Sequence, residues 1–222
     1  MQVIQIGSFA ILLKWLLLGI AIILGLIYIR LWLYFSQKGV IDKRLIDLLS
    51  NSLFLGFFIW KFSLILFDPS LIMKSPLSLL YFTGGSKGLI LAITVTILFF
   101  FFKAKKLMIP NVFILQSGFL LSFAVLSGYH ILTYIFLNEQ QLSHLFLGLY
   151  TVLIIVIYLL KQKVLSQKAI FTYLIIFSFF NLLLSFINGN TDNKIFLFSL
   201  EQWFFSGLII VSIFYWDKKS FS

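Results

Sequence analysis

Long apolar runs separated by short polar segments make up this chain, and their lengths predict membrane-spanning helices. Each run approaches the roughly 20 residues that a helix needs to cross a bilayer core. We expect seven such helices in a single transmembrane domain covering residues 1–222, at about residues 9–35, 45–67, 80–102, 110–136, 142–160, 169–187 and 195–216. The first run is too long for the apolar part of a signal peptide, so we expect it to be retained.

The composition agrees with this pattern. Hydrophobic residues make up 61% of the chain, only 11% are charged, and the mean hydropathy is +1.09. A water-soluble domain needs more polar surface than this, so the predicted fold class is an all-α polytopic integral membrane protein. The chain has no cysteine and two histidines, which excludes disulfides and thiolate sites. We expect no metal site and no cofactor.

The net charge of +10 comes from cations that lie in short runs between the apolar segments. Such runs are typical of contacts to anionic lipid, so nucleic acid is not an expected partner. Most of them follow the first, third, fifth and seventh predicted helices. By the positive-inside rule this places the N-terminus outside and the C-terminus in the cytoplasm. The residues are Arg30, Lys38, Lys43, Arg44, Lys103, Lys105, Lys106, Lys161, Lys163, Lys168, Lys218 and Lys219.

A glycine cluster opens the third predicted helix. Gly84, Gly85 and Gly88 flank Ser86 and Lys87, so backbone amides there lack covering side chains, and the lysine needs an anion or water beside it. This pattern predicts a phospholipid-headgroup site, or else a backbone bend that lets helices pack closely. A nucleotide-binding loop is not indicated, because the G-x-x-x-x-G-K-[ST] spacing is absent.

Polar residues inside the other runs predict faces that turn toward protein. Tyr129 and His130 lie on such a face of the fourth run. His130 is either an interhelical hydrogen-bonding residue or a proton-transfer or ligand group, and it is the only candidate catalytic residue. We expect His144 to lie at the outer membrane interface. Asn181 in the sixth run and Lys61 in the second are further polar residues at membrane depth.

Five segments carry a family resemblance. They are IGSFAILLKWLLLGI at 6–20, DKRLIDLLSNSLFLGFFIWKFSLILF at 42–67, DPSLIMKSPLSLLYFTGGSKGL at 68–89, NEQQLSHLFLGLY at 138–150 and FSLEQWFFSGLIIV at 198–211. In order and spacing they resemble motifs of the phosphatidylglycerol–prolipoprotein diacylglyceryl transferase family, a multi-pass protein of the bacterial cytoplasmic membrane. The third resembles its signature W-x-G-G-x-S-x-H-G-G. The resemblance implies phosphatidylglycerol as a partner and a headgroup pocket at Lys87, Gly84, Gly85, Ser86, Lys61, Tyr129 and Asn181.

The chain departs from that family at the residues that do the chemistry. Lys87 stands where the family has the signature histidine, and Tyr129 where it has an arginine. Those groups would hold a phosphate and move the proton of a lipoprotein cysteine. We therefore expect a non-catalytic relative that binds phospholipid or acts as an accessory membrane protein. The alternatives are an active diacylglyceryl transferase, and a small transporter or a subunit that binds another membrane protein.

Overall fold

The computed structural model describes residues 3–6, 9–36, 40–75, 78–137, 142–161, 167–187 and 198–216. Within these ranges the protein is a bundle of long helices with a short hairpin at one end. The long helices are α1 (Leu13–Ser36), α2 (Val40–Phe62), α6 (Gly85–Lys106), α7 (Asn111–Phe136), α8 (Leu142–Lys161), α9 (Gln167–Ile187) and α10 (Leu200–Trp216). Three short helices follow α2, namely α3 (Leu64–Phe67), α4 (Pro69–Lys74) and α5 (Ser78–Tyr81).

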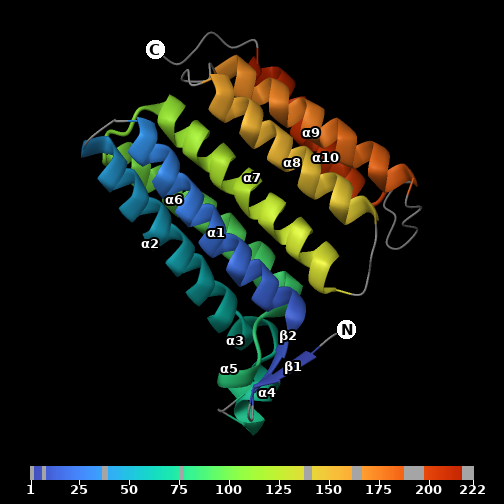
Figure 1. Ribbon diagram of the computed structural model, residues 1–222. Helices are drawn as coiled ribbons and strands as arrows, with labels where there is room; N and C mark the ends of the chain where they lie inside the picture. The colour runs from blue at the N-terminus through green and yellow to red at the C-terminus, as the bar shows by residue number, and fades with distance from the viewer. Residues whose placement is uncertain are drawn as a thin grey trace.

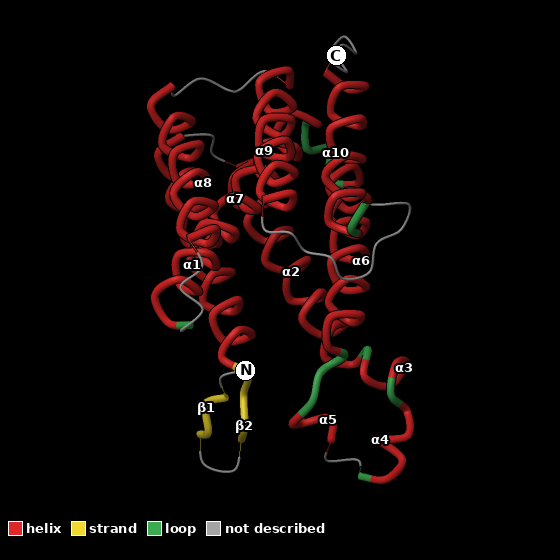
Figure 2. Tube along the Cα trace, turned by 90° about the vertical axis from the view of Figure 1, so that its right-hand side faces the viewer, coloured by secondary structure: helices red, strands yellow, loops and turns green. Residues whose placement is uncertain are grey.

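The long helices run up and down in turn, with α7 in the middle of the bundle (Figure 1). Helix α1 packs mainly against α7, α2 against α6, α8 against α7, and α9 against α10. The N-terminal hairpin and α3–α5 lie together at one end (Figure 2). The other end gathers the ends of α1, α6, α8 and α10, and it carries the lysines in the last turn of α6, Lys103, Lys105 and Lys106.

Five segments are long and apolar enough to cross a membrane: Leu13–Tyr34, Lys43–Phe67, Gly85–Lys106, Asn111–Phe136 and Lys168–Ile187. Leu142–Tyr158 is a shorter apolar helix, and α10 has 17 residues. The all-α architecture is therefore confirmed, with five described segments that could span a membrane. Seven crossings remain a prediction.

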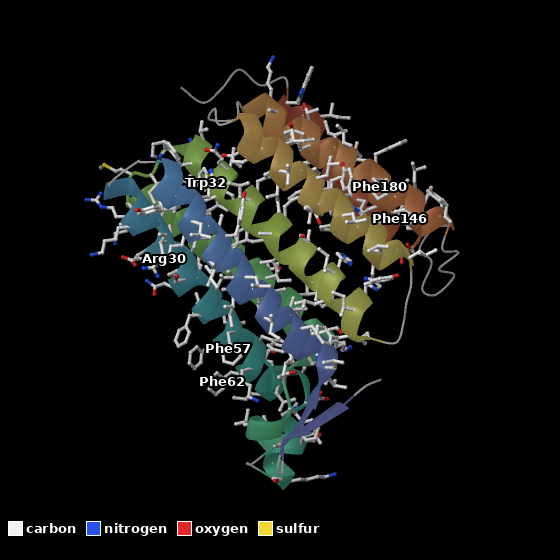
Figure 3. All side chains as sticks on the ribbon, in the orientation of Figure 1. Arg30, Trp32, Phe57, Phe62, Phe146 and Phe180 are labelled. Atoms are coloured by element: carbon white, nitrogen blue, oxygen red, sulfur yellow. The ribbon has the colours of Figure 1, made fainter. Side chains whose placement is uncertain are left out.

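The outer surface of the bundle is apolar, as a lipid-facing surface must be. Phe57 and Phe62 on α2 and Phe146 on α8 point away from the helices (Figure 3), and they are 53%, 47% and 53% exposed. Phe102 near the end of α6 is 73% exposed. In water such a surface would drive aggregation, whereas hydrocarbon chains cover it without cost.

Boundaries of the first three predicted helices were wrong. The second, expected at 45–67, forms α2, which begins at Val40 and ends at Phe62, followed by α3. Residues 9–12, expected to begin the first membrane helix, form β2 (Phe9–Leu12), which pairs antiparallel with β1 (Val3–Ile6). The β-branched residues on both sides favour strands over helix there. The third helix begins at Gly85 instead of residue 80 and continues to Lys106, because the segment Phe82–Gly84 is not helical. The predicted start of the last helix at residue 195 lies outside the described residues.

Small residues let the long helices approach each other. A Cβ atom built on Gly25 would lie 2.7 Å from Val125 Cγ2. A Cβ atom built on Gly56 would lie 2.3 Å from Thr96 Oγ1. A Cβ atom built on Gly148 would lie 2.8 Å from Ile131 Cγ1. These glycines lie at the α1–α7, α2–α6 and α7–α8 contacts. Close backbone approach through glycine is a usual way of packing membrane helices, because lipid provides no hydrophobic drive for association.

Candidate functional site

The glycine turn at the start of α6 is held against the end of α2. Gly84 donates its N–H to the Trp60 carbonyl at 3.2 Å, and the Trp60 indole donates to the Gly85 carbonyl at 3.0 Å. Lys61 Nζ donates to the Phe82 carbonyl at 3.1 Å. Gly85 has φ +59°, a left-handed conformation that glycine adopts without strain. The sequence cluster is thus a hydrogen-bonded turn joining two helices.

Ser63 fills the space that the missing glycine side chains leave. A Cβ atom built on Gly84 would lie 1.8 Å from Ser63 Oγ, and one built on Gly88 would lie 2.1 Å from it. Ser63 in turn donates to the Trp60 carbonyl at 2.7 Å. The close-packing bend predicted for this cluster is present, and the headgroup site predicted for it stays a prediction. Ser86 and Lys87 are exposed on the outer side of the turn.

His130 and His144 meet across α7 and α8. Their Nδ1 atoms are 2.8 Å apart, and the ring centroids are 5.0 Å apart. The interhelical hydrogen bond expected for His130 is therefore present, and its partner is the other histidine of the chain. Tyr129 lies edge-on to His130 with ring centroids 5.6 Å apart.

Asn181 lies apart from the residues with which it was grouped. Its side-chain amide donates to the Phe177 carbonyl one turn earlier in α9, at 2.8 Å. Helix α9 packs against α10 and α7, whereas Lys61 and Lys87 belong to the α2–α6 pair. Lys61 thus contacts the glycine turn, and His130 contacts His144. Asn181 bonds within its own helix and joins neither group.

A cavity of about 180 Å³ lies between the first turns of α2 and the last turns of α6. Arg44, Asp47 and Asn51 line it from α2, and Lys103 lines it from α6. These four residues are exposed, and Leu48, Phe99 and Leu107 complete the walls. Among the described residues no ion pair joins the cations to the carboxylate, so all three charges remain available to a ligand.

The sequence did not predict this cavity, although the spacing of its three polar residues on α2 was visible. Arg44, Asp47 and Asn51 are spaced i, i+3, i+7, which places them on one face of a helix. Nothing in the sequence, however, indicates that Lys103, more than fifty residues later, comes beside them.

No group of three or more histidine, cysteine or acidic side chains that could hold a metal occurs among the described residues. Comparison of the chain with protein-family models, with curated proteins and with solved structures gives no match.

Proposed function

We propose that this chain is a multi-pass membrane protein that binds the headgroup of an anionic phospholipid in the cavity between α2 and α6. The observation that carries the proposal is the charge arrangement there, with Arg44, Asp47 and Asn51 on the α2 wall and Lys103 on the α6 wall. A phosphodiester placed between two cations gains charge-assisted hydrogen bonds, which are roughly twice as strong as neutral ones.

Asp47 and Asn51 suit the rest of a phosphatidylglycerol headgroup. A carboxylate accepts hydrogen bonds from hydroxyl groups, and an amide both accepts and donates them. The glycerol diol next to the phosphate supplies such hydroxyls. The exposed apolar faces of α2 and α6, at residues such as Phe57 and Phe102, provide a surface for the acyl chains.

The cavity lies at the end of the bundle that carries the α6 lysines. Cations on that side favour a cytoplasmic location, so the bound lipid belongs to the inner leaflet, of the bacterial cytoplasmic membrane in this proposal. The chain would then cross the membrane seven times with its N-terminus outside. This differs from the outer headgroup site expected at Lys87.

The relation to the diacylglyceryl transferases stays part of the proposal, and we propose binding without turnover. Transfer needs a cation on the phosphate and a base near the sulfur together. Lys61 donates to a backbone carbonyl and His130 is bonded to His144, which supports a non-catalytic role. A labelled-diacylglycerol assay with a lipobox peptide should show no transfer, and robust turnover would contradict this part.

Native mass spectrometry of the purified protein tests lipid binding. We expect retained phosphatidylglycerol in the wild type and less in Arg44→Gln and in Lys103→Gln. Removing one cation near an anionic headgroup loses about 1 kcal/mol, or roughly a fivefold change in affinity. Lys105→Gln is the matched control, because it removes the same charge from an exposed position on α6 that does not line the cavity.

Lys87→Ala distinguishes the two ends of the bundle. If the lipid binds at the glycine turn, this variant alone should lose it. Equal retention of lipid in Arg44→Gln, Lys103→Gln and Lys105→Gln would remove the α2–α6 cavity as the site, and preferential retention of phosphatidylethanolamine would change the lipid class.

A further inference from the structure

The two histidines of this chain occupy one small region, between α7 and α8 near the end opposite the basic turns. His130 lies in the last two turns of α7, which ends at Phe136, and His144 lies in the first turn of α8, which begins at Leu142. Both side chains are partly buried, so they are held by the helices and keep part of their surface exposed.

The close approach of the two rings is fixed by the backbone. Gly148 lies one turn after His144, and a Cβ atom built on it would be 2.8 Å from Ile131 Cγ1 and 3.6 Å from His130 Cβ. A larger residue at this position would push α8 away from α7. Glycine therefore keeps the two helices close enough for the imidazoles to meet.

The facing atoms are both Nδ1, at 2.8 Å. Two neutral imidazoles can hold this contact only if one ring is protonated at Nδ1 and the other presents its lone pair there. A cation that takes two lone pairs can replace the shared proton. Zinc binds histidine nitrogen at about 2.0–2.1 Å in tetrahedral geometry, which places two such nitrogens about 3.3 Å apart. The rings need to separate by about half an ångström and each tilt by about 35°, so that both lone pairs converge on the cation.

We propose that His130 and His144 form a binding site for a divalent transition-metal cation of the zinc type, with water in the remaining positions. Imidazole is a preferred ligand of such cations. The site has too few protein ligands for a closed structural centre, so the cation is exchangeable and keeps open positions. It crosslinks α7 and α8 at their outer ends. This proposal does not depend on the lipid site, which lies between other helices at the opposite end.

The composition of the chain makes the test unusually clean. With no cysteine and only these two histidines, a preparation carrying a histidine-free affinity tag has no thiol and no other imidazole that could bind Zn²⁺. The full chain is purified in detergent micelles, stripped with a chelator, and dialysed against Zn²⁺. We expect about one Zn²⁺ bound per chain in the wild type, lost in His130→Ala and in His144→Ala. Tyr129→Phe is the matched control, since it changes the neighbouring ring and keeps both imidazoles.

X-ray absorption spectroscopy of the zinc-loaded wild type decides the question without any variant. Two imidazole nitrogens in the first shell are the expected result. The proposal is overturned if the wild type binds no Zn²⁺, if the bound metal has oxygen ligands only, or if both histidine variants, shown to be folded by their thermal unfolding, bind as much as the wild type.

Discussion

Trp60 and Gly85 are joined by a hydrogen bond from the indole N–H to the glycine carbonyl, 3.0 Å long, between the last turn of α2 and the first residue of α6. The neighbouring Gly84 N–H bonds back to the Trp60 carbonyl at 3.2 Å. Between these two points the chain leaves the bundle through α3, α4 and α5. These two hydrogen bonds hold the two ends of that segment together and fix the register of α2 against α6.

Replacing Trp60 with phenylalanine keeps an aromatic ring and removes the indole donor. The Gly85 carbonyl then loses the indole donor, and we expect the free energy of unfolding to fall by about 0.5–1.5 kcal/mol. Unfolding by a denaturing detergent, followed by circular dichroism, measures this change. Phe102→Leu, at a 73% exposed position, should leave the transition unchanged. An unaltered midpoint in Trp60→Phe would show that the bond contributes nothing.

Gly88→Ala tests the close approach at Ser63. The added methyl would lie 2.1 Å from Ser63 Oγ and 3.2 Å from Ser63 Cβ, so we expect a loss of about 1–3 kcal/mol from overpacking. In a Ser63→Ala background the hydroxyl is absent, so we expect Gly88→Ala to lower the free energy of unfolding by only about half as much. Gly118→Ala is the control, because nothing lies within 4 Å of a Cβ there. Equal costs in both backgrounds would mean that Ser63 is not the obstacle.

A buried amide in α7 gives a third prediction. Gln116 is 0% exposed, its amide nitrogen donates to the Tyr158 hydroxyl, and its Oε1 has no hydrogen-bond partner among the described residues. Tyr158→Phe removes the acceptor and leaves the whole amide unsatisfied, which costs about 1–3 kcal/mol.

Adding Gln116→Leu to Tyr158→Phe removes the orphaned amide as well. We therefore expect the double variant to recover most of the stability in the same detergent unfolding assay. A double variant less stable than Tyr158→Phe alone would show that Gln116 contributes through its packing instead of its hydrogen bond.

Topology is the fourth prediction. If the basic end of the bundle faces the cytoplasm, reporters fused after Lys106, Lys168 and Ser222 should be active only inside, and those placed near Lys74, Glu139 and Asn190 only outside. Paired cytoplasm-specific and exterior-specific reporters at each site provide the control. An exterior signal after Lys106 would remove both the orientation and the seven-span arrangement.

The existence and order of the long helices could be predicted because an apolar run of about 20 residues has few other stable forms in a membrane. Boundaries were less predictable. Phe9–Leu12 continues an apolar run in sequence, yet it pairs with Val3–Ile6 as a strand. A short apolar segment does not by itself distinguish a strand from an added helical turn.

The contents of the candidate sites depended on packing between distant segments. The glycine cluster was visible, but its occupant, Ser63, lies on a segment whose pairing with α6 the sequence does not specify. His130 had no partner within its own run, and only the α7–α8 contact supplies His144. Lys103 reaches Arg44 and Asp47 for the same reason, through the antiparallel packing of α2 and α6.

The pairing of α1 with α7 has a consequence for biosynthesis. Ala21 and Gly25 of α1 lie against Gly128 and Val125 of α7, and α1 packs much less against α2, the next long helix along the chain. During translation α2 and α6 emerge and can pair as a hairpin while α1 still lacks its main neighbour. The first helix must therefore remain in lipid or with an insertion factor until α7 leaves the ribosome, so truncation before residue 111 should expose α1 to quality-control proteolysis.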